Sequence, residues 1–210
     1  MSASAPNVPY YCQWESADAA ARIIARELRL VDDPLWRNSG ASSPHEYAEW
    51  ANHICGMACL KMILAARTGI VHPTIDLARM ALASGAYVIK EGTIHGMIYA
   101  PFVQMLGSRF GIDAKVVTDV AAADLARNWL PGSLFLASVH PSIRLQKPPP
   151  PKRGGHLVLV TNASAEHLTF HNPSGHDPAT QQNARLAVNV FAEFFAGRGV
   201  LVAPAPQNAS

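Results

Sequence analysis

The chain has 210 residues, of which 49% are hydrophobic and 15% are charged, and its formal net charge is +2. This length suits one domain with a substantial buried core, and the composition is that of a globular chain rather than a disordered one. The mild charge excludes the basic surface of a nucleic-acid-binding protein, and no apolar run is long enough to span a membrane.

The termini and the cysteines set the expected organisation. Residues 8–203 are predicted to form a single domain, whereas residues 1–7 and 204–210 are rich in Ala, Ser, Pro and Asn and are expected to be flexible tails. The opening residues do not have the pattern of a secretory signal. Three cysteines do not suggest a disulfide framework, so we expect a soluble cytoplasmic protein with no membrane partner.

The first half of the chain is predicted to be mainly helical. A short strand is expected at residues 8–13, and a loop rich in Asp, Pro, Ser and Gly at residues 31–44. Apolar residues recur at helical spacing in four segments, namely residues 16–30 with Ser16 as N-cap, 55–67 ending at Gly69, 74–83 ending at Gly85, and 93–110 with a break or kink at Pro101.

The second half is predicted to be mainly strands. The expected strands are residues 112–118, 133–139, 156–163, 166–172 and 199–203, with helices at residues 121–129 and 190–195. A proline-rich basic insert, RLQKPPPPKRGG, precedes the third of these strands. Segregation of helices and strands predicts an α+β fold, in which an N-terminal helical layer packs on a C-terminal antiparallel sheet.

The segment ICGMACL places two thiols on one face of the second long helix. Cys55 lies in the first turn, where free backbone N–H groups and the helix dipole favour a thiolate and lower its pKa. Cys59 lies one turn further in, where apolar packing favours the neutral thiol. Burial of both in the core is the alternative interpretation, and a zinc site is poorly supported because no second pair of ligands has suitable spacing.

A cysteine nucleophile needs a base, and His156 is the histidine best placed to supply one. It opens an apolar strand after two glycines, and the next strand ends at Asn172. A tight turn centred near Ser164 would place His156 opposite Asn172 at the open end of a hairpin. The Asn172 carbonyl oxygen would then accept a hydrogen bond from one imidazole nitrogen and orient the other.

These motifs resemble the papain-like cysteine peptidases, especially the bacteriocin-processing peptidases that cut after double-glycine leaders and their stand-alone relatives. The resemblance rests on VPYYCQW, CGMACLKMIL, GGHLVLVTNAS and HNPSG, and on the closing FAEFFAGRGVLV. Many family members have proline where this chain has Met57, and aspartate where it has Asn172. These 210 residues show no transporter portion, so leader removal coupled to export is not expected, and the substrate specificity of the family does not carry over.

The resemblance implies a papain-like fold and a role for each matched residue. Cys55 would be the nucleophile, His156 the general base and acid, Asn172 the residue that orients His156, and Gln13 an oxyanion-hole donor beside the Cys55 N–H group. These roles predict a peptidase or amidase that forms an acyl-enzyme with a peptide or an amide-bearing small molecule, without a metal or cofactor. Acyl transfer to an amine at the same site and a non-catalytic binding module are the two alternatives.

The remaining candidate residues are less favoured for a catalytic or binding role. His167, His171 and His176 are expected to be solvated surface histidines, and Asp177 is a less favoured alternative to Asn172. Cys12 is predicted to be a core residue. Arg144, Lys147, Lys152 and Arg153 of the basic insert either border the cleft and favour a carboxylate-bearing substrate or belong to a solvated polyproline loop.

Overall fold

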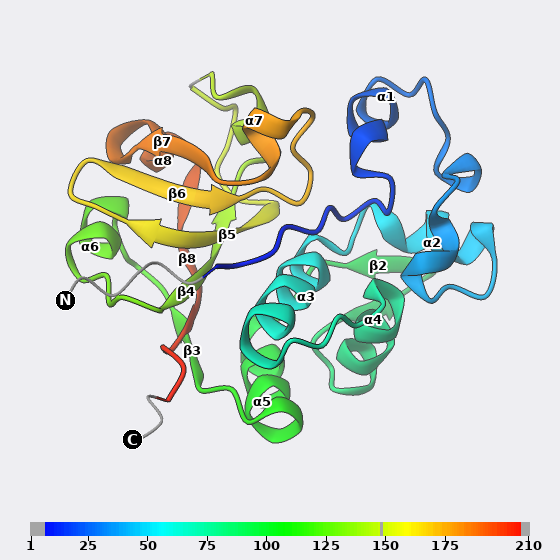
Figure 1. The fold of residues 1–210 in the computed structure, drawn as a ribbon, viewed down its shortest axis with the longest axis horizontal. Coiled ribbons are helices and arrows are strands. Elements are labelled where there is room, and N and C mark those ends of the chain that lie inside the picture. The colour runs from blue at the N-terminus through cyan, green and yellow to red at the C-terminus, as the bar shows by residue number, and fades with distance from the viewer. Residues whose placement is uncertain (1–6, 148, 207–210) are drawn as a thin grey trace.

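A computed structural model describes residues 7–147 and 149–206, and an antiparallel sheet forms its centre (Figure 1). Its strand order is β3-β8-β4-β5-β6-β7, and every neighbouring pair is antiparallel. The strands are β3 (Ala114–Val117), β4 (Leu134–Val139), β5 (His156–Ala163), β6 (His167–His171), β7 (Ala184–Ala187) and β8 (Phe195–Val202). A separate hairpin joins β1 (Val88–Lys90) to β2 (Thr93–His95).

Helices cover both faces of this sheet. They are α1 (Ala20–Ile24), α2 (Pro44–Ala51), α3 (Cys55–Thr68), α4 (Thr74–Ala83), α5 (Tyr99–Phe110), α6 (Ala122–Arg127), α7 (Pro178–Gln181) and α8 (Val188–Phe194). The larger group, α1 to α5, lies beside the sheet in Figure 1, whereas α6 and α8 lie on its other side. The predicted α+β fold, with N-terminal helices followed by an antiparallel sheet, is confirmed.

The strands divide the apolar side chains between two clusters by the alternation of a pleated sheet. Leu136, Leu157 and Leu159 face the cluster that contains α3, whereas Phe135 and Val158 face the cluster that contains α8. Because β4 is covered on both sides, all its residues are buried. The sheet therefore separates the two apolar clusters. Polar residues can lie at the ends of β5 and β6, outside these clusters.

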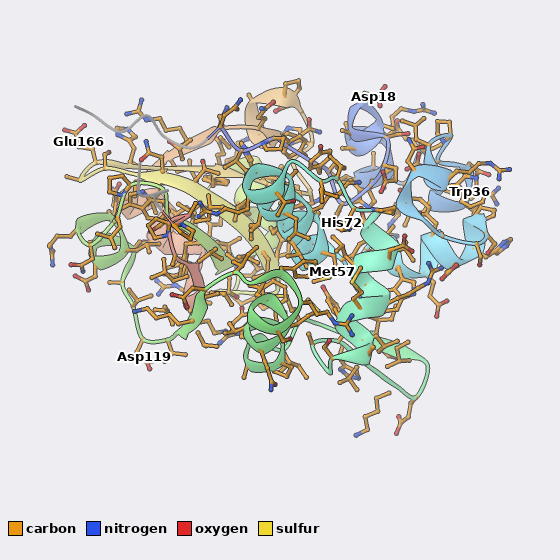
Figure 2. All side chains as sticks on the ribbon, turned by 60° about the horizontal axis from the view of Figure 1, so that its bottom comes forward. Asp18, Trp36, Met57, His72, Asp119 and Glu166 are labelled. Carbon is orange, nitrogen blue, oxygen red and sulfur yellow. The ribbon has the colours of Figure 1, made fainter. Side chains whose placement is uncertain are left out.

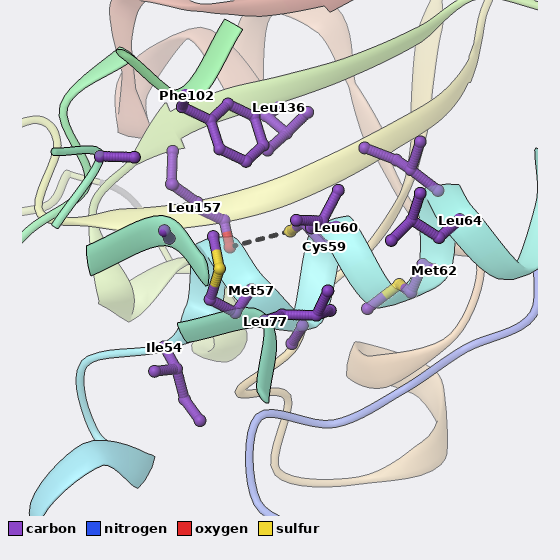
Figure 3. Packing of buried hydrophobic residues seen from close by; sticks show 14 of the residues in the cluster. Ile54, Met57, Cys59, Leu60, Met62, Leu64, Leu77, Phe102, Leu136 and Leu157 are labelled. Atoms are coloured by element: carbon purple, nitrogen blue, oxygen red, sulfur yellow. Dashed lines mark hydrogen bonds between the residues drawn. The ribbon is translucent and has the colours of Figure 1, made fainter. Parts of the chain in front are cut away.

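Helix α3 packs against one face of the sheet. All residues from Gly56 to Leu64 are buried, and Gly69 ends the helix in the left-handed conformation, as predicted. Met57, labelled near the centre of Figure 2, is completely buried and lies beside Leu77 of α4 in Figure 3. Figure 3 shows the packing of Leu60 and Leu64 from successive turns of this helix. Lys61 is a charged residue within this buried stretch, and its Nζ atom forms an ion pair with the Glu15 carboxylate at 3.6 Å.

The predicted helix at residues 16–30 is wrong. The structure has a short 3-10 turn, Ala17–Ala19, followed by α1, and Arg26 has a left-handed backbone with φ of 63°. Ser16 precedes the 3-10 turn, but its side chain makes no capping hydrogen bond, because its hydroxyl donates to the buried Asp33 carboxylate. Tertiary hydrogen bonding to Asp33 thus overrides the helical pattern of the sequence.

The strand predicted at residues 8–13 is also absent. This segment is extended but joins no ladder, and polar groups hold it against the residues after β6. The backbone N–H of Gln13 donates to Pro173 O at 2.9 Å, and the Tyr10 hydroxyl donates to Asn172 O at 3.1 Å. In Figure 1 this segment runs between the sheet and the helical part.

Several short elements were not predicted. Helix α2 begins at Ser43, whose side chain accepts a hydrogen bond from Glu46 N, with Pro44 in the first turn. The predicted helix at residues 93–110 is instead β2 followed by α5, where Pro101 lies in the first turn and causes no break. Strand β7 adds an edge to the sheet beyond β6, and the short helix α7 precedes it in the chain.

The structure bears on two further expectations. No helix within residues 7–147 and 149–206 has both the length and the apolar character needed to cross a membrane. Most of the predicted flexible tails, residues 1–6 and 207–210, lie outside the described residues.

Candidate functional site

The amino end of α3 positions Cys55. The preceding residue, Ile54, is completely buried and has a non-helical backbone, so the helix begins at Cys55 itself. The first N–H groups of a helix have no partner within that helix. Cys55 is partly exposed, whereas the residues that follow it from Gly56 onward are buried. Cys55 is thus the partly exposed residue at the start of an otherwise buried stretch of the helix.

The start of β5 positions His156, and the end of β6 positions Asn172. His156 is 6% exposed and Asn172 is completely buried. The His156 Nε2 atom lies 2.9 Å from Asn172 Oδ1. The predicted register placed these residues directly opposite each other, but Leu159 pairs with His171, so Asn172 lies two positions further along β5 than predicted. The long side chains bridge this offset.

Neighbouring donors fix the orientation of the Asn172 amide. The Ser174 backbone N–H, which can only donate, points to Asn172 Oδ1 at 3.1 Å. The oxygen of the amide must therefore face both Ser174 and His156. Because Oδ1 can only accept, His156 Nε2 carries the proton and His156 Nδ1 is left unprotonated in the neutral ring. Nδ1 is thus the nitrogen available to accept a proton.

Ser174 is a site residue that sequence reasoning missed. Its hydroxyl lies 3.0 Å from His156 Nε2 and 3.4 Å from Asn172 Oδ1, and the side chain is 2% exposed. The His156 N–H is therefore shared between the amide and hydroxyl oxygens. The only signal in the sequence is the position of Ser174 two residues after Asn172, because the contact depends on the actual hairpin register.

Gln13 lies against the amino end of α3. Its Nε2 atom donates to Ala51 O at 3.1 Å, and the side chain is 4% exposed. Because a carbonyl oxygen can only accept, this contact fixes the amide orientation and leaves one Nε2 hydrogen for another acceptor. The Gln13 Oε1 atom is buried and has no hydrogen-bond partner among the described residues. Composition alone favoured a surface glutamine here, and only the resemblance indicated a site residue.

Burial favours the neutral forms of the thiol and the imidazole. It lowers the pKa of His156 to about 4, although the hydrogen bond to Asn172 raises it, and the nearby positive charge of Arg144 lowers it further. Burial also raises the pKa of Cys55, while backbone N–H groups of Leu157 and Gly56 lower it. The N–H groups at the helix start lower the pKa of Cys55, as expected, but burial raises it by more. The prediction of a lowered Cys55 pKa is therefore wrong.

Two cavities flank Cys55 and His156, and both residues line each of them. One cavity, of about 480 Å³, is also bordered by Gln13, Ser174 and Arg144. The other, of about 440 Å³, is also bordered by apolar side chains and Arg198. These volumes fall within the range of small-molecule and peptide sites. Within the described residues, Cys55 Sγ makes no hydrogen bond to His156, although both open onto the same space.

The remaining candidates have other contacts. The Asp177 carboxylate caps α7 by accepting from Thr180 N at 2.9 Å, so it is not the partner of His156. His171 is 1% exposed and binds Val8 O at 2.8 Å, so the prediction of a solvated surface histidine is wrong for it. The N-terminal segment covers this end of β6 and buries the ring. Cys12 is buried beside Pro173, as predicted.

Cys59 differs from Cys55 although both lie on one helix. It is completely buried, and its thiol points to Leu157 O at 3.9 Å (Figure 3). Burial raises its pKa well above the usual value. Among the described residues, no group of three or more His, Cys, Asp or Glu side chains could hold a metal ion.

A comparison with solved structures identifies a known fold with the same overall arrangement. The chain matches a structure described as a C39-like peptidase from Bacillus anthracis with a TM-score of 0.50, 12% identity, and coverage of 74% of this chain and 90% of the other. This chain shares the fold of that C39-like peptidase. The shared fold agrees with the papain-like resemblance in the sequence, and at this identity it concerns the fold alone.

Two further structures show the same kind of similarity. The peptidase domain of Streptococcus ComA, a bifunctional ABC transporter of a quorum-sensing pathway, matches with a TM-score of 0.47 and 18% identity, over 72% of this chain and 92% of that domain. A double-glycine motif protease from an AMS/PCAT transporter, solved with its leader peptide, matches with a TM-score of 0.48 and 14% identity, over 72% and 84%. Neither the family models nor the curated protein sequences give a match.

Proposed function

We propose that the protein is a cysteine-dependent peptidase or amidase that cleaves its substrate through an acyl-enzyme on Cys55. The observation that carries this proposal is the His156–Asn172 hydrogen bond of 2.9 Å beside the partly exposed thiol. The bond leaves His156 Nδ1 as a base, and Cys55 and His156 line the same cavities. A thiol, a base and a residue that orients the base are the parts that nucleophilic catalysis requires.

In the first step, the Cys55 sulfur attacks the carbonyl carbon of the scissile amide. His156 Nδ1 takes the thiol proton as the S–C bond forms, and the carbonyl electron pair moves onto oxygen. The Cys55 N–H and the free Gln13 Nε2 hydrogen are the proposed donors to this oxyanion. Such preorganised donors stabilise charge that exists only in the transition state.

In the second step, the tetrahedral intermediate collapses and the C–N bond breaks. His156 Nδ1 returns its proton to the departing amine, which leaves a thioester on Cys55. Water then attacks the thioester while His156 accepts one of its protons. Collapse of that second intermediate releases a carboxylic acid and restores the thiol by proton return from His156.

The shifted pKa values favour proton transfer during attack over a preformed ion pair. A pKa of about 4 leaves His156 neutral at pH 7, and a raised pKa leaves Cys55 as the thiol. A neutral imidazole is a competent base, and its Nε2–H remains held by Asn172. We also propose a reducing compartment such as the cytoplasm, supported by the free thiols Cys12, Cys55 and Cys59.

Trapping the acyl-enzyme tests this function. The protein is incubated with p-nitrophenyl esters of N-acylated amino acids and dipeptides, quenched in acid, digested and mapped by mass spectrometry. The expected result is an acyl mass on the peptide that contains Cys55, absent from Cys55→Ala and retained in Cys59→Ala. Acylation that is unchanged in Cys55→Ala would contradict the proposal. Repeating the reaction with an added amine distinguishes hydrolysis from acyl transfer by product mass.

A further inference from the structure

The cavity on the Gln13 side of Cys55 is positively charged. Its lining includes Arg26, Arg29 and Arg144 and contains no aspartate or glutamate. Arg29 is paired with Asp32 at 2.7 Å, whereas Arg26 and Arg144 form no ion pair with any described residue. A substrate that fills this cavity therefore meets uncompensated positive charge beside the thiol.

Arg144 is the guanidinium whose position is fixed. It lies on the 3-10 turn Pro141–Leu145, which His140 caps by accepting from Ser142 N. Ile143 anchors the turn in the core, where it is 1% exposed. Arg144 Nε donates to Pro141 O at 2.9 Å, so one edge of the guanidinium is held by the protein.

The outer edge of the same guanidinium is free. The two terminal nitrogens of Arg144 make no hydrogen bond to any described residue, although the side chain is partly buried. Arg144 and His156 line the same cavity, and the positive charge of Arg144 lowers the pKa of His156. Two parallel N–H donors in a plane match the two oxygens of a carboxylate.

We propose that Arg144 binds a carboxylate of the substrate in the cavity on the Gln13 side of Cys55. This inference rests on the proposed function, and it names the substrate class as a peptide or amide with a carboxylate close to the scissile bond. The cavity on the other side of Cys55 is lined by Tyr87, Met97 and Tyr99 together with the exposed Arg198, and it does not include Arg144. Arg144 is thus a specificity residue rather than a participant in the bond-breaking steps.

A matched pair of alkylating reagents tests the charge preference without knowledge of the substrate. N-iodoacetylglycine carries a carboxylate, and N-iodoacetylglycinamide is its neutral counterpart. The alkylation rates of Cys55 are measured by mass spectrometry and divided by the rates with N-acetylcysteine amide, which removes intrinsic reactivity. The expected preference for the anionic reagent is about tenfold in dilute buffer, from the attraction of two unit charges at partly screened range.

Three variants locate this preference. Arg144→Gln should bring the ratio of anionic to neutral rates close to one, Arg144→Lys should retain part of it, and Arg127→Gln should leave it unchanged. Arg127 is a suitable control because it lies on α6 in an exposed ion pair with Asp124. A preference that survives in Arg144→Gln, or a wild-type ratio near one, would overturn the proposal. If Cys55 reacts no faster than Cys59 even with the neutral reagent, the proposed function fails instead.

Discussion

The first and second turns of α3 carry the same functional group in two different settings. Cys55 is partly exposed, lines two cavities and lies beside His156. Cys59 is completely buried, and its thiol points to a backbone carbonyl of β5 at 3.9 Å. One turn of helix therefore separates a candidate nucleophile from a core residue.

The difference teaches that position at a boundary, more than residue type, makes a thiol a candidate for chemistry. Cys55 lies where α3, the start of β5 and the segment after β6 meet, and each contributes a polar group. Cys59 faces only the packed interior between helix and sheet (Figure 3). Free thiols in such interiors behave as small apolar residues. Five predictions test this comparison, beginning with the largest expected effect.

Replacing each thiol in turn should give the largest difference in activity between Cys55 and Cys59. Cys55→Ala should reduce the turnover of any accepted amide or ester substrate by about 10⁴-fold or more, because the thiol that forms the acyl-enzyme is lost. Cys59→Ala should change turnover by less than about threefold and lower the free energy of unfolding by about 1 kcal/mol. Steady-state rates and urea titrations measure both. Equal losses of activity in the two variants would remove the distinction between them.

The third polar position on α3, Lys61, tests how the Gln13 segment is held to this helix. Lys61 and Glu15 are both almost fully buried, and Thr74 accepts from Lys61 Nζ at 3.3 Å and donates to Glu15 at 3.1 Å. Lys61→Met should cost about 3–5 kcal/mol of unfolding free energy, because it leaves a carboxylate buried without its partner. The double variant with Glu15→Leu should recover most of this loss. Additive losses in urea titrations would show that the pair is not coupled.

Gln13→Ala tests whether the amide beside the first turn contributes to catalysis. Loss of an oxyanion-hole donor should lower kcat by about 10²–10³-fold with little change in KM. The neighbouring Asn52→Ala serves as a control, since Asn52 lines the same cavity but is exposed. A rise in KM at constant kcat would place Gln13 in ground-state binding instead.

The buried, neutral His156 predicts a stability change with pH. Its folded pKa of about 4 lies below the unfolded value of about 6.5, so the unfolded chain binds more protons between these limits. Stability should therefore fall as the pH drops from 7.5 to 4.5, and His156 should account for about 2–3 kcal/mol of the loss. Urea titrations of the wild type and His156→Gln at both pH values isolate this share. An identical pH dependence in both proteins would contradict it.

Ser174→Ala is the smallest expected change. One of the two oxygens that share the His156 N–H is removed while Asn172 remains, so kcat should fall by about fivefold. Asn172→Ala, which removes the main acceptor, should have a larger effect on kcat. Because Ser174 acts only by positioning the imidazole, KM should stay constant in Ser174→Ala. A larger loss in Ser174→Ala than in Asn172→Ala would reverse the order assigned to the two residues.

Local patterns predicted the parts of the site that belong to long regular elements. The apolar spacing and Gly69 fixed α3, and with it the place of Cys55 in the first turn. The hairpin from β5 to β6 brought His156 and Asn172 to one end, even though the register differed by two residues. The Ser174 contact depends on that register and could not be predicted.

Contacts between distant segments explain what the sequence did not reveal. The pattern of residues 16–30 is helical, but Asp33 binds Ser16 and Tyr47, and the chain turns at Arg26. The place of Gln13 depends on Pro173 and Ala51, which no local rule connects to it. The raised pKa of Cys55 follows from burial by the surrounding elements, whereas the sequence indicated only the helix start.

The most direct test of the account compares the alkylation rates of Cys55 and Cys59 with iodoacetamide near neutral pH. Time-resolved peptide mapping should show Cys55 reacting at least about tenfold faster, with this advantage reduced in His156→Ala because the base is lost. Asp177→Ala is the matched control and should leave both rates unchanged. If Cys55 reacts no faster than Cys59, or its rate does not depend on His156, the first turn of α3 is not a nucleophilic site.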